Sequence, residues 1–425
     1  MDIMCQSAPE AMRMDRYLSW HELKYRRPPE GMSSEQWWLG IKLHRAQARQ
    51  NLPLCNAKDE HFNFASTNYI QQNLHLVDRE AGALLITDAG AAFSVAERDK
   101  YLLTSIAEEA IMSSMLEGAV VTRSEARELI RSNRPPRDEH EQMVMNNYHT
   151  MQMILQHKDE PLTPAFILSL HRSMVTGTLQ NPQKAGVLRS DSDRVHIEDV
   201  RSGEIIHTPP PASSLQERLE ALCRFANGED DTAQYIHPVI RAIILHFQLA
   251  YDHPFVDGNG RTARSIFYWA MLHAGYWLFE YISISREIYR RSRSYYESFL
   301  NTEEDDNDLN YFIVDQLLTI HKSIKSLMEY ARNKQKSHEQ LQHTLSGIVN
   351  INHRQKKLLL QFLRHPNSYT TVSTHCSEHG IVRQTARTDL TGLEKLGLLY
   401  SETISREFVF KPVSNLEKRL LQLTQ

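Results

Sequence analysis

The 425-residue chain is poor in cysteine, glycine and proline. Its four cysteines are widely scattered and form no CxxC pair, which excludes a disulfide-stapled fold and favours reduced thiols. Glycine and proline number only 16 each while 41% of the residues are hydrophobic, so the chain is neither fibrous nor largely disordered. At this length the sequence predicts roughly two to four globular domains.

Long hydrophobic runs are also missing. The most apolar stretch, 239–251, is interrupted by Arg241 and His246 and falls well short of the roughly 20 residues that span a bilayer. The first residues carry acids and a proline where a secretory signal would be continuously apolar. We therefore expect a cytoplasmic protein that does not contact a membrane.

Neither sign of charge dominates the whole chain. It holds 48 Lys and Arg against 52 Asp and Glu, for a formal charge of -4. Binding to nucleic acid would therefore have to be a property of one region and not of the whole protein.

Two regions ahead of the C-terminal part differ in pattern. Residues 1–95 hold three of the five tryptophans and a capping-box start at Ser33, which predicts a helix to about residue 50 within an N-terminal helical extension. Residues 96–335 have apolar side chains three and four apart almost throughout, which is typical of a helical domain. Between residues 189 and 211, two short β-favouring runs predict a hairpin on that domain. The fold class that we expect is mainly α.

Residues 353–425 form a separate basic region, with eleven Lys and Arg against six Asp and Glu. Their pattern predicts three helices followed by two strand-like runs, and the segment 382–399 resembles the recognition helix of a winged helix-turn-helix domain. Such a domain can contact DNA, or it can dock a protein or a second copy of the chain. The modest basicity leaves both uses open.

The most informative stretch, residues 253–264, reads HPFVDGNGRTAR and separates two predicted helices. Gly258 and Gly260 let the backbone approach a ligand closely, and the start of the following helix offers unpaired N–H groups. Arg261 and Arg264 lie three positions apart on one face of that helix, so both guanidinium groups can clamp phosphates of a nucleotide. The segment therefore predicts a phosphate-binding site.

The other polar residues of this segment suit chemistry at a phosphate. Asn259 adds a neutral hydrogen-bond donor. Asp257 supplies the hard carboxylate that a hydrated Mg²⁺ needs when the ion arrives with a nucleotide. A histidine, whose ordinary pKa is about 6.5, can take a proton from an attacking hydroxyl near neutral pH, which makes His253 the candidate base. Phe255, in contrast, is expected to anchor the loop in the core.

The segment resembles the Fic family motif HPFxDGNGRxxR at every fixed position. Members of this family are helical, and most transfer AMP from ATP to a Ser, Thr or Tyr hydroxyl of a target protein that a β-hairpin flap holds. The resemblance covers roughly residues 95–334 and implies that the hairpin near 195–207 is that flap. It implies the following site: His253 as base, Asp257 as Mg²⁺ ligand, and Gly258, Asn259, Gly260, Arg261 and Arg264 as the cradle for the phosphates of ATP.

Two further expectations come from the same resemblance. Tyr296 falls near the position where the family contacts adenosine. Gly260 matches the glycine of the AMP-transferring members, whereas the kinase-like Doc relatives carry lysine there.

A second motif, at residues 113–118, resembles the inhibitory (S/T)xxxE(G/N) helix of the same family. Ser113 and Glu117 lie one turn apart on one helix face, and Gly118 is well suited to end that helix. The resemblance implies autoinhibition, in which Glu117 reaches across to Arg264. The same carboxylate can also position a water molecule that removes AMP from a modified target.

Two functions from different classes follow from these features. One is a protein adenylyltransferase that uses ATP and Mg²⁺ and whose C-terminal domain selects partners. The other is a DNA-binding regulator in which the helical domain only senses a nucleotide. The sequence favours the enzyme, because a sensor has no need of the base His253 beside the cradle. It leaves open the target protein, the oligomeric state, a homodimer included, and the signal that relieves inhibition.

Overall fold

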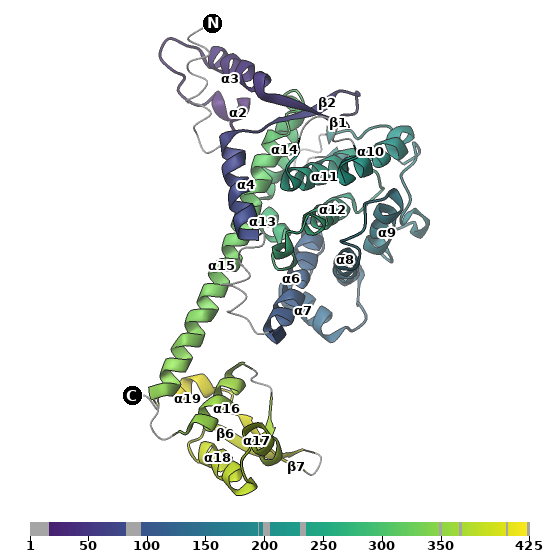
Figure 1. Ribbon diagram of the computed structural model, residues 1–425. Coiled ribbons are helices and arrows are strands. Elements are labelled where there is room, and N and C mark those ends of the chain that lie inside the picture. Colours follow the sequence, from purple (N-terminus) through teal and green to yellow (C-terminus); the bar gives the residue numbers. More distant parts are fainter. Residues whose placement is uncertain are drawn as a thin grey trace. The chain divides into compact units, whose positions relative to one another are not determined.

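The computed structural model describes residues 17–81, 95–193, 195–198, 205–229, 235–347, 351–364, 368–404 and 407–422. The chain divides into two compact units, Met1–Met328 and Glu329–Gln425. Both units are mainly helical with small sheets, as the apolar periodicity predicts (Figure 1). No helix in the described ranges is long and apolar enough to cross a membrane.

The N-terminal part of the first unit combines helices with a β-hairpin. Helix α3 (Ser34–Ala48) begins at the predicted capping box, in which Ser33 and Gln36 each accept a hydrogen bond from the other's backbone N–H. The chain continues directly into β1 (Arg49–Cys55), which pairs antiparallel with β2 (His61–Ala65). Helices α2 (Trp20–Leu23) and α4 (Asn68–Ala81) flank these elements.

This hairpin was not predicted, and it makes the segment only partly helical. Leu52 and Leu54 are buried at alternate positions of β1, whereas residues 62–65 on β2 are all buried. The apolar alternation is too short to be recognised beside the longer helical signals. The hairpin is joined to the helical domain, since the backbone N–H of Asn63 donates to the carbonyl of Asn307 at 3.1 Å.

Two long buried helices, α11 (Pro238–Asp252) and α12 (Asn259–His273), pack against each other in the core of the helical domain. The segment 253–258 connects them. The surrounding helices are α6 (Val95–Leu116), α7 (Arg123–Ser132), α8 (Glu139–Gln156), α9 (Pro164–Val175), α10 (Leu215–Asn227), α13 (Ile284–Arg290), α14 (Ser292–Glu304) and the first part of α15 (Asn310–Gly347).

A short antiparallel pair stands where the sequence predicts a hairpin. It is formed by β3 (Ile197–Glu198) and β4 (Ile205–His207), with Ile197 opposite His207. The connecting residues 199–204 lie outside the described residues.

Within its described residues, the second unit contains a three-stranded antiparallel sheet and, after α15, four further helices. Its strands β5 (Thr370–Thr371), β6 (Leu399–Ile404) and β7 (Glu407–Pro412) are ordered β5-β7-β6. Its helices are α16 (His353–Arg364), α17 (Val372–His379), α18 (Arg383–Lys395) and α19 (Leu416–Gln422). Three helices followed by two paired strands is the predicted order, while the assignment to the winged-helix class stays a prediction.

Candidate functional site

The segment between α11 and α12 turns sharply through two residues with left-handed backbone. His253 ends α11 with φ of 45°, and Gly258 precedes α12 with φ of 78°. A Cβ at position 258 would lie only 2.7 Å from Cγ1 of Val175, so a side chain is excluded by space as well as by backbone conformation. Gly258 therefore lets the loop pass close to α9 and begin α12.

Buried side chains hold the shape of this loop. The amide group of Asn259 accepts from the backbone N–H of Phe255 at 2.9 Å and donates to its carbonyl at 2.8 Å. Phe255 is fully buried, as expected of a loop anchor, and its ring stacks on that of His171 with centroids 3.7 Å apart. In this structure the amide of Asn259 thus braces the loop from within.

Two residues outside the motif support the loop and were missed by sequence reasoning. The Nδ1 atom of His171 accepts from the N–H of Gly186, so its Nε2–H donates to the carbonyl of Asp257 at 2.9 Å. Burial lowers the pKa of His171 to about 4, which keeps this ring neutral. Arg189 donates through Nε to the carbonyl of His253 at 2.8 Å. Neither residue carries a sequence signal of its own, because each acts on a loop distant in the chain.

The ring of His253 is oriented as a base. Its Nδ1 lies 3.1 Å from the carbonyl oxygen of Ala250, which can only accept, so Nδ1 carries the hydrogen and Nε2 keeps a lone pair. Burial lowers the pKa of His253 below its usual value, against smaller raising effects of the Ala250 carbonyl and the Glu117 carboxylate. The imidazole is therefore neutral at physiological pH and able to accept a proton.

Asp257 and Arg261 face each other at the start of α12. The Asp257 carboxylate accepts from the N–H of Gly258 at 2.6 Å and from Nη2 of Arg261 at 3.3 Å, and its side chain is 52% exposed. Arg261 is buried, and its Nη1 donates to the carbonyl of Met174 at 3.3 Å. The Asp257 carboxylate is therefore the more accessible of the two side chains to a ligand arriving from solvent.

Arg264 is buried and is held by residues at the end of α6. Its Nε donates to Oγ of Ser113 at 2.9 Å, and its Nη2 donates to the Ser113 carbonyl at 3.1 Å and to Oε1 of Glu117 at 2.9 Å. Burial opposes the charge of Arg264, but the Glu117 carboxylate raises its pKa overall. The structure therefore brings both residues of the second motif onto the last arginine of the first.

The Glu117 carboxylate lies directly over the start of α12. A Cβ at position 260 would collide with its Oε1, so Gly260 makes room for this carboxylate as well as for a ligand. Burial opposes ionisation of Glu117, but Arg264 and Arg261 lower its pKa. A negative oxygen thus occupies the place that the sequence predicts for a phosphate.

Tyr296 on α14 (Ser292–Glu304) lies within electrostatic reach of Glu117 and Arg264. Burial and the Glu117 carboxylate raise the pKa of Tyr296, although 48% of the residue is exposed. On the same helix, the Glu303 carboxylate lies 3.0 Å from Nδ1 of His207, and Nε2 of that ring lies 2.8 Å from the carbonyl oxygen of Tyr251. His207 therefore links strand β4 to both α11 and α14 through hydrogen bonds.

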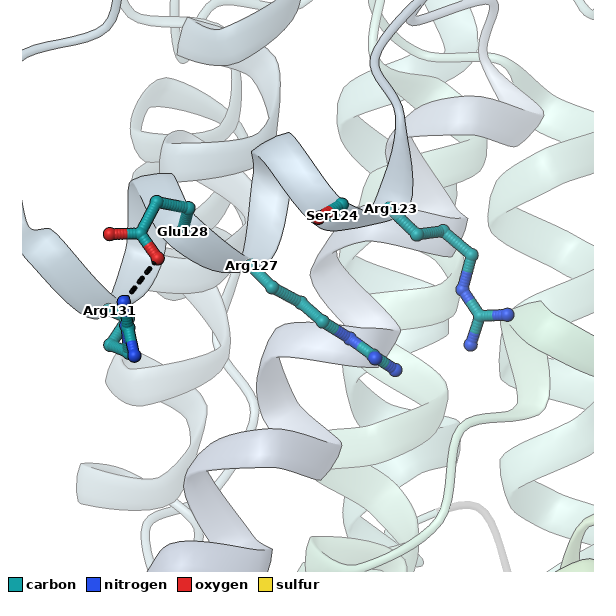
Figure 2. Close-up of a pocket in the computed structure, with 5 residues that line it drawn as sticks. All are labelled: Arg123, Ser124, Arg127, Glu128 and Arg131. Carbon is teal, nitrogen blue, oxygen red and sulfur yellow. Dashed lines mark hydrogen bonds and ion pairs between the residues drawn. The ribbon is translucent and has the colours of Figure 1, made fainter. Parts of the chain in front are cut away.

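A shallow pocket of about 490 Å³ lies on α7 and is lined by residues other than those of the two motifs (Figure 2). Its lining consists of Arg123, Ser124, Arg127, Glu128 and Arg131. Arg127 donates to the carboxylate of Glu108 on α6 at 2.8 Å, and Arg123 contacts the same carboxylate.

Within the described residues, no three His, Cys, Asp or Glu side chains group closely enough to hold a metal ion. A cation at Asp257 would therefore need further ligands from water and a bound nucleotide.

Comparison with known proteins points to one family. Residues 161–271 match the model of the Fic/DOC family. The protein adenylyltransferase Fic of Nematostella vectensis is 32% identical over 119 residues, which are 28% of this chain and 25% of that protein. The protein of the same name from Drosophila melanogaster is 31% identical over 128 residues, with the same shares of 28% and 25%. The chain thus matches about a quarter of the length of these curated relatives.

Two solved structures share the fold. A Fic family protein from Desulfovibrio desulfuricans G20 superposes with a TM-score of 0.53 at 16% identity, covering 81% of this chain and 95% of that one. Fic-1 (aa134 - 508) from C. elegans superposes with a TM-score of 0.50 at 20% identity, covering 77% of this chain and 82% of that one.

Proposed function

Since this chain carries a domain of the Fic/DOC family, we propose that it is a protein adenylyltransferase that moves AMP from ATP to a Ser, Thr or Tyr hydroxyl of a target protein. The observation that carries the proposal is the pairing of a base with an anion site. The Nε2 lone pair of His253 is available at one end of the loop, and the start of α12 with its two arginines lies at the other.

In the reaction, the target hydroxyl gives its proton to Nε2 of His253 while its oxygen bonds to the α-phosphorus of ATP. The bond from that phosphorus to the bridging oxygen breaks, and pyrophosphate leaves. Arg261, Arg264 and the N–H groups at the start of α12 hold the phosphates in line for this attack. Gly260 favours nucleotidyl over phosphoryl transfer, because the kinase-like Doc relatives carry lysine at that position.

Asp257 fits the Mg²⁺ that accompanies ATP. Its carboxylate is half-exposed and adjoins the anion site, and a single carboxylate suits an ion that takes its other ligands from phosphates and water. When bound, the ion supplies positive charge to the phosphate oxygens.

The resting enzyme is autoinhibited through Glu117. Arg264 cannot hold Glu117 and a phosphate of ATP in the same geometry, and Glu117 holds it at 2.9 Å. ATP still binds, but its phosphates lie out of line, so inhibition falls on transfer more than on affinity. The same carboxylate can position water for removal of AMP, which would give the protein a reverse activity.

Target and adenosine are held at the edges of the site. The β3–β4 hairpin offers a short edge that can pair with an extended peptide of the target. Tyr296 packs against the adenosine.

The position of the label in ATP tests this proposal. ATP labelled at the α-phosphate is expected to mark protein in a cell extract incubated with the chain. Marking from the γ-phosphate alone would show phosphoryl transfer and would overturn it.

A second candidate function rests on the C-terminal unit. The exposed positions of α18 include Arg383, Arg387 and Lys395, whereas the acid Asp389 is buried and bonded to Arg354. This cationic face favours contact with DNA, with the first unit acting as a nucleotide sensor. The competing use is docking of the target or of a second copy of the chain.

Salt dependence separates these uses. If a DNA duplex binds with a log-log salt slope steeper than about -3, several phosphates are neutralised and the regulator gains support. If the unit serves docking, removing residues 353–425 is expected to spare self-modification and nucleotide binding but to weaken selection of the target.

A further inference from the structure

Helix α6 presents a row of polar side chains to the helical core, and Glu117 is only its last member. Glu109 and Ser113 lie on α6, and Glu117 follows directly after its last residue, Leu116; the three are spaced by four residues and so lie on one side of this segment. Their contacts on α12 are spaced by four in the opposite direction, in the pairs Glu109 with Tyr268, Ser113 with Arg264, and Glu117 with Gly260. The two helices therefore meet in antiparallel register along this row.

Glu109 is the most firmly held member of the row. Its carboxylate is 2% exposed and accepts from the hydroxyl of Tyr268 at 2.8 Å, from Oγ of Ser283 at 2.7 Å and from the backbone N–H of Ser285 at 3.0 Å. Oγ of Ser285 also donates to it. These donors are neutral and come from α12 and the start of α13, so the carboxylate is solvated by fixed groups of the core.

We propose that Glu109 is a positioning residue that fixes the register of α6 and so holds Glu117 on Arg264. This inference rests on the proposed autoinhibition and names the part of the fold that maintains it. A shift of α6 along or away from α12 would strip donors from a buried carboxylate, which is costly because no water replaces them. The donors to Glu109 therefore resist any movement of the helix.

The rigidity of α6 carries this constraint to the active site. Eight residues of helix span about 12 Å, and the two glutamates lie on one continuous face. Ser113 lies between them and bonds Arg264. Release of Glu109 therefore acts on the distant contact between Glu117 and Arg264 without touching either residue.

The neighbouring acid provides a matched control. Glu108 is also buried, but its carboxylate turns to α7, where it contacts Arg123 and Arg127. Glu108→Gln changes the same charge on the same helix and leaves the contacts with α12 and α13 intact.

The test measures AMP incorporation from α-labelled ATP by the full chain. Glu109→Gln places an amide N–H₂ among groups that donate, so it is expected to raise the rate about 5-fold or more, within the range of ordinary coupling between sites. In the Glu117→Gly background the same substitution is expected to add nothing, because both changes release the same contact. Glu108→Gln is expected to leave the rate within about 2-fold of the native chain.

Four results would overturn the role of Glu109 or the autoinhibition on which it rests. Equal activation by Glu108→Gln, or activation by Glu109→Gln that persists beside Glu117→Gly, would overturn the role of Glu109. If Glu117→Gly activates and Glu109→Gln does not, the positioning role is wrong while autoinhibition stands. If Glu117→Gly itself fails to activate, the autoinhibition is wrong.

A milder variant covers the case in which Glu109→Gln does not fold. Tyr268→Phe removes one donor and keeps the charge, and it is expected to give a smaller activation together with faster amide hydrogen exchange in residues 110–116. Unchanged rate and exchange in this folded variant would also overturn the proposal.

Discussion

The loop 253–258 and the end of helix α6 both bring functional side chains to the start of α12, but they are built in different ways. The loop is held partly by its own neighbours in the chain, such as Asn259 bonded to the backbone of Phe255, and partly by His171 and Arg189. Helix α6 reaches the same place from a position 147 residues earlier in the chain. Its contacts depend on how whole helices pack.

Because of this difference, substitutions in the loop and on α6 are expected to affect transfer in different ways. A change within the loop removes a reacting group or distorts the path of the chain, so its effect on transfer is a loss. A change on α6 shifts an equilibrium between two arrangements of Arg264, so its effect is a gain. Substitutions in the two regions should therefore move the rate in opposite directions.

The largest loss is expected for His253→Ala in the loop. Removing a general base typically lowers a rate by about 10² or more, whereas nucleotide affinity should survive because the cradle is intact. The measurements are AMP incorporation and nucleotide binding by calorimetry. Transfer at the native rate in this variant would show that another group takes the proton.

The largest gain is expected for Glu117→Gly at the end of α6. If the inhibited arrangement is favoured by about 1.4 to 3 kcal/mol, its release raises transfer roughly 10-fold to 150-fold. The native chain, Glu117→Gly, Arg264→Ala and the double variant form a cycle in which the gain should vanish without Arg264. A gain that survives loss of Arg264 would assign the effect of Glu117 to another partner.

Alanine substitutions at one glycine in each region compare how far the two regions tolerate a side chain, measured by the free energy of unfolding. Gly258 and Gly118 both have positive φ, but a Cβ at 258 would meet Val175 whereas a Cβ at 118 would meet no atom within 4 Å. Gly118→Ala should cost about 1 to 2 kcal/mol, the usual strain of a left-handed residue, and Gly258→Ala about 2 to 4 kcal/mol with the added overlap. Urea unfolding of the two variants measures the difference, and equal losses would mean that α9 yields to the new methyl group.

The smallest effect is a shift in pH dependence. Burial lowers the pKa of His253, so transfer should persist to a pH below the usual value for histidine and be lost as the pH falls through the lowered pKa. Glu117 raises that pKa, so Glu117→Gly should move the acid limb further down. Profiles of kcat/KM against pH for both chains give the direction, and a shift to higher pH would contradict the contact between the two regions.

Much of the site could be predicted because its parts are contiguous. The spacing of residues 253–264 indicates a base and a phosphate cradle, and the burial of Phe255 was also expected. The hairpin of β1 and β2 could not be distinguished from its helical surroundings, since each strand shows only a few alternations. His171 and Arg189 lie in unremarkable sequence, and their roles depend on a loop more than 60 residues away.

The sequence alone determines the chemistry that the loop can perform, because side chains adjacent in the chain stay adjacent in any fold that keeps the turn at Gly258. It also determines that Ser113 and Glu117 share a helix face. Tertiary structure decided that Glu109 continues the row into the core. It also decided that the Glu117 carboxylate lies where Gly260 leaves room. Those contacts join residues far apart in the chain, and only the packing of α6 against α12 and α13 brings them together.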